Sequence, residues 1–170
     1  MNENHSGIFF SEIKIEEIPD DQRPVLIADS FSTPENIGHL IRLAANVGAM
    51  KVIVLDAAVH RQSKINKTAG TAIKHTDVIF CSQDELKEHI PQGYVLTALE
   101  TSPGAENIFT ASLPDRMALV LGNEKYGMRK ELIEMCDQKV FIPMPGPVKS
   151  MNVTHAAAVS LFVWLSRFYR

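Results

Sequence analysis

Residues 140–156 read Val140-Phe-Ile-Pro-Met-Pro-Gly-Pro-Val-Lys-Ser-Met-Asn-Val-Thr-His-Ala156. The apolar start predicts a buried strand that ends at the first proline, and the loop after it leads into a long apolar helix. An earlier stretch, Ala118-Leu-Val-Leu-Gly-Asn-Glu-Lys-Tyr-Gly-Met128, likewise runs from an apolar strand into a loop that contains glycine. Both loops carry polar groups that can serve a ligand at the ends of the strands.

The rest of the chain alternates apolar runs with helical patterns. We expect strands at 25–28, 51–55, 78–81, 94–99, 117–121 and 139–142, and helices at 36–47, 68–73, 84–90, 129–136 and 152–169. Apolar runs separated by helices are typical of a parallel sheet that is covered on both faces. The 170 residues are enough for one full core. The sequence therefore predicts a single α/β domain, a mostly parallel sheet flanked by helices, at 23–170, after a polar extension at 1–22.

The composition is that of an ordinary globular protein, with 45% hydrophobic and 22% charged residues. No apolar run has the length of a membrane span, and the first residues lack the basic and apolar regions of a secretion signal. Cys81 and Cys136 lie far apart in sequence and favour two reduced thiols. We therefore expect a cytoplasmic protein with no membrane partner. The net charge of −3 restricts any contact with nucleic acid to a local patch.

Several common motifs are absent from the sequence. It has no glycine fingerprint for dinucleotides, no P-loop and no G-x-S-x-G motif. The six histidines are scattered, without H-E-x-x-H or C-x-x-C, so no metal site is expected. In an α/β domain the ligand binds at the carboxyl ends of the strands. Here those ends carry the segments 99–104, 122–124 and 142–146, which can enclose a flat, uncharged ring with backbone groups.

Three motifs follow one another along the chain. They comprise Asn36, Gly38 and Arg42; then Leu119, Leu121, Gly122, Glu124 and Gly127; then Ile142, Pro143, Met144, Ser150, Met151, Asn152, Val153, Thr154 and Ala156. In order and spacing they resemble the motifs of the SpoU/TrmH family of RNA ribose methyltransferases, within the SPOUT superfamily. Two positions depart from the family pattern, because Met151 stands for leucine and Thr154 for serine. The resemblance covers about residues 24–168.

The resemblance implies S-adenosylmethionine as the methyl donor, a deep C-terminal trefoil knot, an obligate homodimer and no metal. It places the cofactor against Leu99, Gly122, Ile142, Ser150 and Met151. It assigns the chemistry to Arg42, Asn36, Glu124 and Asn152. It also makes a phosphate-binding patch for RNA of Arg61, Lys64 and Lys67, which would otherwise be a solvated basic face.

Each of these residues also has an ordinary structural interpretation. Asn36 and Asn152 are suitable helix caps, as is Ser150. Glu124 either pairs with Lys125 or Arg129, or orients Arg42 or Asn152. Alone, Arg42 would be a solvated surface residue; within the motif it acts on the ribose 2′-hydroxyl, either as a base or, because a guanidinium stays protonated, by holding a phosphate and stabilising the alkoxide. His155 is expected to be a packed or interface residue.

The expected function is therefore methylation of a ribose 2′-hydroxyl in RNA, with transfer RNA as the first substrate and ribosomal RNA as the alternative. A knotted RNA-binding protein without catalysis is the rival from another class. A base methyltransferase of the same superfamily is a third possibility, against which the setting of Arg42 argues.

Overall fold

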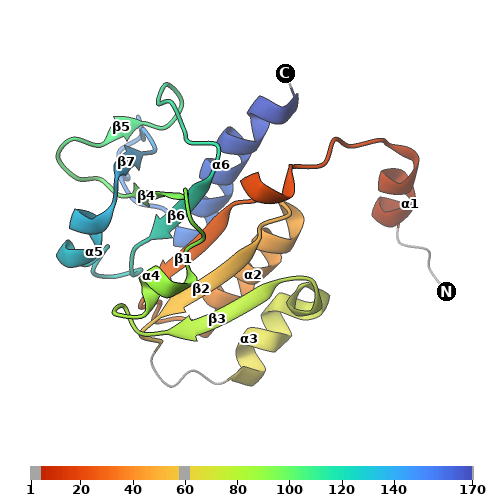
Figure 1. The fold of residues 1–170 in the computed structure, drawn as a ribbon, viewed down its shortest axis with the longest axis horizontal. Coiled ribbons are helices and arrows are strands. Elements are labelled where there is room, and N and C mark those ends of the chain that lie inside the picture. Colours follow the sequence, from red (N-terminus) through yellow and green to blue (C-terminus); the bar gives the residue numbers. More distant parts are fainter. Residues whose placement is uncertain (1–4, 58–61, 170) are drawn as a thin grey trace.

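The computed structural model describes residues 5–57 and 62–169. Figure 1 shows one α/β domain around a parallel sheet, which confirms the predicted architecture. The seven strands are β1 (Val25–Asp29), β2 (Lys51–Leu55), β3 (Asp77–Cys81), β4 (Val95–Leu99), β5 (Glu106–Asn107), β6 (Met117–Leu121) and β7 (Gln138–Phe141). The helices are α1 (His5–Glu12), α2 (Pro34–Asn46), α3 (Gln62–Ala69), α4 (Leu86–His89), α5 (Lys130–Met135) and α6 (Val153–Leu165), and short 3₁₀ turns occupy Asp20–Gln22, Gly70–Lys74 and Ser166–Tyr169.

Helices cover both faces of the sheet. Leu26 and Ala28 of β1 point into a core formed with α2, α3 and α6, whereas Val25 and Ile27 point into a second core formed with α4 and α5. All five residues of β1 and of β6 are buried, as expected for central parallel strands. The continuous apolar runs at β1 and β6 therefore correspond to strands that have no solvent face, whereas the apolar run at β3 forms a partly exposed edge strand.

The strand order is β3-β2-β1-β6-β4-β7-β5, and every pairing is parallel. The chain leaves β4 for the edge of the sheet, returns to the centre with β6, and crosses β4 again to form β7. The last helix, α6, then packs against α2. This order fits the expected knot. It also gathers the loops after β1, β4, β6 and β7 at one edge of the sheet, as parallel strands require.

Some details differ from the sequence-based expectations. The helix expected at 68–73 is wrong, because α3 ends at Ala69 and Gly70, with φ +60°, begins a 3₁₀ turn. The final α-helix stops at Leu165 rather than 169 and continues as a 3₁₀ turn. The elements that were not predicted include α1, the first six residues of α3, and β5, which consists of only two residues, both polar.

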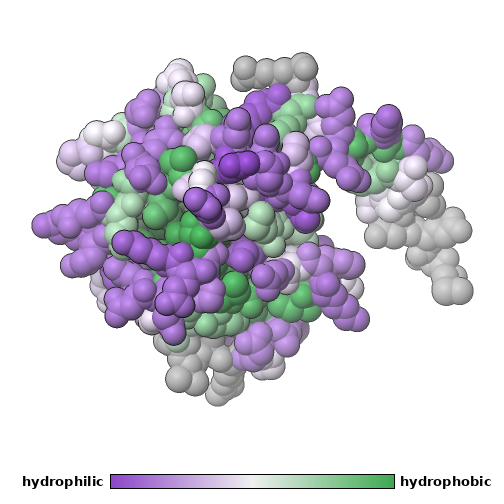
Figure 2. All heavy atoms as spheres, in the orientation of Figure 1, coloured by the Kyte–Doolittle hydropathy of each residue, from purple (hydrophilic) through white to green (hydrophobic). Residues whose placement is uncertain are grey.

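The N-terminal segment stands away from the sheet (Figure 1). Phe9 and Phe10 of α1 are both exposed. Figure 2 shows mainly hydrophilic side chains over the body of the molecule in this view, with apolar groups visible on the N-terminal arm. Among the described helices, none combines the length and the apolar character needed to cross a bilayer.

Gly38 marks the closest approach of α2 to α3. A Cβ at Gly38 would lie 2.6 Å from the Cβ of Thr68 and 2.8 Å from the carbonyl oxygen of Ile65. We predict that Gly38→Ala lowers the free energy of unfolding by about 1–3 kcal/mol, because the two helices must separate. Urea denaturation measures this. Gly146→Ala is the control, since no atom lies within 4 Å of its added Cβ; equal stability of the two variants would contradict the prediction.

Candidate functional site

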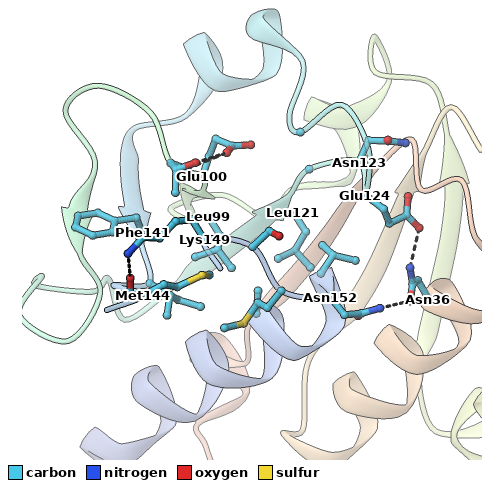
Figure 3. A pocket seen from close by; sticks show the side chains of 18 of the residues that line it. Asn36, Leu99, Glu100, Leu121, Asn123, Glu124, Phe141, Met144, Lys149 and Asn152 are labelled. Atoms are coloured by element: carbon cyan, nitrogen blue, oxygen red, sulfur yellow. Dashed lines mark hydrogen bonds between the residues drawn. The ribbon is translucent and has the colours of Figure 1, made fainter. Parts of the chain in front are cut away.

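A cavity of about 320 Å³ opens at the carboxyl ends of β4, β6 and β7 (Figure 3). The structure places all five residues expected to hold the cofactor in its lining, namely Leu99, Gly122, Ile142, Ser150 and Met151. Asn36, Glu124 and Asn152 line it as well, whereas Arg42 does not. The cavity therefore brings together eight of the nine residues assigned to the cofactor and the chemistry.

Gly122 lines the cavity at a position where no larger residue fits. A Cβ at Gly122 would lie 2.5 Å from the backbone nitrogen of Met128 and 2.7 Å from the carbonyl carbon of Gly127. These are backbone atoms of the same loop, so they cannot move aside as a flexible side chain can. The close approach lets the loop fold back over the end of β6 and leaves backbone groups at the cavity.

Glu124 is the centre of a hydrogen-bond network in the cavity wall. Its carboxylate accepts hydrogen bonds from the backbone N–H of Ser32 at 2.8 Å, from the Ser32 hydroxyl at 2.9 Å and from the backbone N–H of Thr33 at 3.1 Å. It also accepts one from Nδ2 of Asn36 at 2.8 Å. The carboxylate thus joins the end of β6 to the start of α2.

The network continues from Asn36 to Asn152 (Figure 3). Nδ2 of Asn152 donates to Oδ1 of Asn36 at 3.2 Å, and Oδ1 of Asn152 accepts from the backbone N–H of Thr154 at 2.8 Å. Asn152 is therefore the N-cap of α6, as the sequence suggested. The alternative interpretation of Asn36 as a helix cap is wrong, because α2 begins at Pro34 and its N-cap is Thr33. Asn36 lies within the first turn and uses its side chain to link Glu124 with Asn152.

These contacts keep Glu124 ionised. Burial raises the pKa of the carboxyl, but the hydrogen bonds from Asn36 and Ser32 outweigh burial and lower the pKa from 4.5 to about 2. Neither Lys125 nor Arg129 forms an ion pair with Glu124 among the described contacts, so the ion-pair alternative for Glu124 is wrong. The carboxylate instead orients Asn152 through Asn36.

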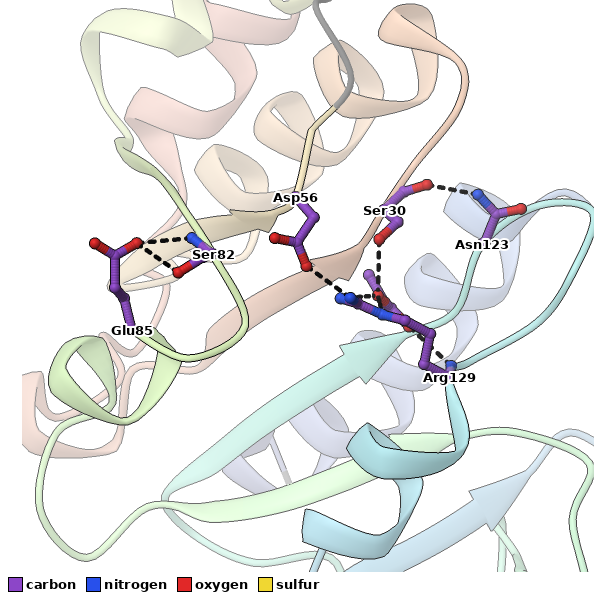
Figure 4. A network of polar contacts seen from close by, with 7 residues as sticks. Ser30, Asp56, Ser82, Glu85, Asn123 and Arg129 are labelled. Atoms are coloured by element: carbon purple, nitrogen blue, oxygen red, sulfur yellow. Dashed lines mark hydrogen bonds and ion pairs between the residues drawn. The ribbon is translucent and has the colours of Figure 1, made fainter.

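A second network, which sequence reasoning missed, holds the base of the same loop (Figure 4). The Arg129 guanidinium contacts Oδ1 of Asp29 at 2.6 and 2.7 Å and Oδ2 of Asp56 at 2.6 Å. Burial lowers the pKa of Arg129, but the two carboxylates outweigh it and raise the pKa above its usual value. Asp29 is fully buried. A charge at the end of a buried strand needs a partner, but no local sequence pattern identifies Arg129, 100 residues away, as that partner.

The remaining predicted residues lie outside the cavity. Arg42 is exposed on α2. Lys64 and Lys67 are exposed on α3, and Lys64 forms an ion pair with Glu35 at 3.3 Å. Arg61 lies outside the described residues. His155 is exposed and lines a second cavity of about 260 Å³, which shares Asn36 and Asn152 with the first.

The part of the chain that the structure describes contains no cluster of three possible metal ligands. The lining of the main cavity is suited to an organic ligand instead. Leu99, Ile142 and Met151 supply apolar surface, while Glu100 and Glu124 lie on opposite sides of the cavity (Figure 3). Apolar walls with a few fixed polar groups are typical of cofactor sites.

A comparison with protein families shows to which family the chain belongs. The profile of the SpoU rRNA Methylase family matches residues 23–162. The chain belongs to the SpoU rRNA methylase family. The match includes the three motifs and the ends of β1, β4, β6 and β7 that surround the cavity.

Similar individual proteins support this family assignment. The 23S rRNA (guanosine-2′-O-)-methyltransferase RlmB of Xylella fastidiosa is 35% identical over 144 residues, covering 83% of this chain and 57% of the relative. RlmB of Haemophilus influenzae is 34% identical over 145 residues, covering 83% of this chain and 59% of the relative. The chain thus spans less than two thirds of the length of these relatives.

Solved structures with a similar fold include a SpoU methyltransferase. The methyltransferase AviRb from Streptomyces viridochromogenes, in complex with the cofactor AdoMet, superposes with a TM-score of 0.79 at 25% identity, covering 88% of this chain and 60% of AviRb. A structure described as giving insights into the 2-OH methylation of C/U34 on tRNA has a TM-score of 0.77 at 24% identity, covering 87% of this chain and 98% of its own. The second likeness shows the shared fold alone.

The low pKa of Glu124 makes its contribution to stability dependent on pH. Because the folded pKa, about 2, lies below the ordinary 4.5, the ionised carboxylate stabilises the fold above pH 4.5, and this is lost as pH falls toward 2. We predict that Glu124→Gln destabilises the protein most above pH 4.5 and that its difference from wild type narrows below it. Urea denaturation over a pH series measures this. Glu131→Gln, an exposed site on α5, is the control; a difference for Glu124→Gln that is the same at every pH would contradict the prediction.

Proposed function

We propose that the chain is an S-adenosylmethionine-dependent methyltransferase that acts on a ribose 2′-hydroxyl of RNA. The observation that carries the proposal is the cavity at the carboxyl ends of β4, β6 and β7, whose wall contains the hydrogen-bonded series Glu124, Asn36 and Asn152. AviRb, which is structurally similar, is described in complex with AdoMet, and the RlmB relatives are named as 2′-O-methyltransferases.

The residues of the cavity fit this cofactor. Leu99, Ile142 and Met151 offer apolar surface to a flat ring, and the loop at Gly122 comes close enough for backbone contacts. When bound, S-adenosylmethionine supplies a methyl group that is activated by the positive charge of its sulfur. The protein then has to align the ribose, exclude water and assist one proton, which requires positioned groups and no metal.

Asn36 and Asn152 are placed to position the ribose. Both residues line the main cavity and also the second cavity, which lies between α2 and α6. They therefore lie between a methyl donor bound in the main cavity and a nucleotide bound in the second cavity. Glu124 acts through Asn36, because its carboxylate fixes the direction of that amide. We assign Arg42 to the RNA phosphate and the developing alkoxide rather than to a base, since a guanidinium stays protonated.

We place ribosomal RNA first among the substrates. The sequence alone favoured transfer RNA, but the two RlmB relatives described above, at 35% and 34% identity, are named as 23S rRNA guanosine methyltransferases. Transfer RNA is the second candidate. Arg61, Lys64 and Lys67 are proposed as phosphate contacts. A homodimer, a cytoplasmic location and a methyltransferase domain at 23–170 after an extension at 1–22 complete the proposal.

Methylation of defined RNAs tests the activity. The protein is incubated with labelled S-adenosylmethionine and with unmodified large-subunit rRNA or tRNA transcripts, and alkali-resistant linkages are mapped. We expect resistance at one position of the rRNA. Resistance only in tRNA would overturn the substrate order, and label without resistance would indicate a base methyltransferase. RNA binding without any label would favour the non-catalytic RNA-binding protein.

A substitution at Arg42 tests catalysis without changing the cofactor site, because Arg42 lies outside the main cavity. We predict that Arg42→Ala lowers kcat by about a hundredfold or more, the usual loss for a group that stabilises developing charge. S-adenosylmethionine affinity, measured by calorimetry, should stay unchanged. Arg42→Lys should recover little, because an ammonium lacks the two-pronged phosphate contact. The control is Lys87→Ala, at an exposed basic residue of α4; full activity of Arg42→Ala would refute the assignment.

A further inference from the structure

The loop after β6 ends in a tight hairpin at 123–127. The backbone N–H of Asn123 donates to the carbonyl of Gly127 at 2.9 Å, and the N–H of Gly127 donates back at 3.0 Å. Oδ1 of Asn123 accepts from the backbone N–H groups of Lys125 and Tyr126 at 2.9 and 3.2 Å. Gly127 closes the turn with φ +71°, a conformation that favours glycine. The backbone of the tip is therefore fixed by the hairpin's own polar groups.

Four residues anchor this hairpin to the rest of the domain. Nδ2 of Asn123 donates to the carbonyl of Ser30, and Glu124 accepts its hydrogen bonds from the start of α2. The backbone N–H of Met128 donates to Oε2 of Glu100 at 3.0 Å. Arg129 is held by the buried Asp29. Residues on both sides of the tip are thus tied to the ends of β1 and β4, and the tip has a defined direction.

Tyr126 occupies the tip and is 88% exposed, more than any other large hydrophobic residue whose exposure the structure describes. A single exposed aromatic ring is common on protein surfaces and carries no meaning by itself. The position of this ring is what matters. Its neighbour Gly127 lines the main cavity, and its other neighbour, Lys125, is an exposed cation. A rigid hairpin therefore presents a ring and a positive charge beside the candidate site.

We propose that Tyr126 is a stacking platform for a nucleobase next to the methylated nucleotide, with Lys125 on the adjoining phosphate. The inference rests on the proposed function and names a residue that reads its RNA. Exposed loop nucleotides are recognised by stacking on aromatic side chains, and a positive group tracks the backbone. A fixed platform loses less conformational freedom on binding than a mobile one. Tyr126 would select an RNA whose neighbouring base is unstacked.

The test measures affinity for the large-subunit rRNA transcript with variants of Tyr126. We expect Tyr126→Ala and Tyr126→Leu to weaken RNA binding by about tenfold, within the range for loss of one stacked base, and Tyr126→Phe to bind as wild type does. The salt dependence of binding should not change for Tyr126→Ala, but its slope should fall by about one for Lys125→Ala. Phe10→Ala is the matched control, at an exposed ring on α1.

A fluorescent variant reports the contact itself. The chain has one tryptophan, Trp164, which is fully buried and gives a constant background. In Tyr126→Trp, stacking on a base should quench the added exposed indole when the transcript binds.

Three results would overturn the inference: unchanged affinity of Tyr126→Ala, equal affinity of the leucine and phenylalanine variants, or an equal loss of S-adenosylmethionine affinity in Tyr126→Ala. In each case wild-type methylation of RNA would leave the proposed function intact. A wild-type protein that neither binds nor labels RNA would end both proposals.

Discussion

The ionised carboxylate of Glu124 holds the site together. It receives four hydrogen bonds from residues 32–36, which joins the end of β6 to the start of α2. Its partner Asn36 lies 88 residues before it in the sequence, and Asn36 in turn contacts Asn152, which lies 116 residues after Asn36. One charge therefore sets the relative positions of three segments that the sequence keeps far apart. Because the hydrogen bonds exceed the cost of burial, the carboxylate stays charged and the geometry persists at neutral pH.

The surrounding structure supports this arrangement from two sides. Gly122 lets the loop after β6 fold back against its own backbone, and Arg129 ties the end of that loop to Asp29 and Asp56. The parallel sheet places all of these groups at one edge, since the carboxyl ends of its strands point the same way. The loops that follow these strands therefore meet around the main cavity.

Much of the fold could be predicted from the sequence. Continuous apolar runs located six of the seven strands, because a buried parallel strand must be apolar on both faces. The motifs located the cavity residues, which the structure places together. Contacts between distant residues were harder to predict. No local pattern distinguishes the Asp29–Arg129 pair from surface charges, or makes Asn36 a link rather than a cap. The two-residue strand β5 is too short for any periodicity, and its pairing with β7 depends on the crossing of the chain.

In the proposed function, the Glu124–Asn36–Asn152 series forms one wall of the methyl-donor site. A crystal structure of the protein with S-adenosylhomocysteine shows whether this is so. We expect the nucleoside between Leu99, Gly122 and Ile142, with the Glu124–Asn36 and Asn36–Asn152 hydrogen bonds retained and the ligand's sulfur facing Asn152. Ligand bound elsewhere, or a Glu124 carboxylate released from Asn36 in the complex, would contradict it.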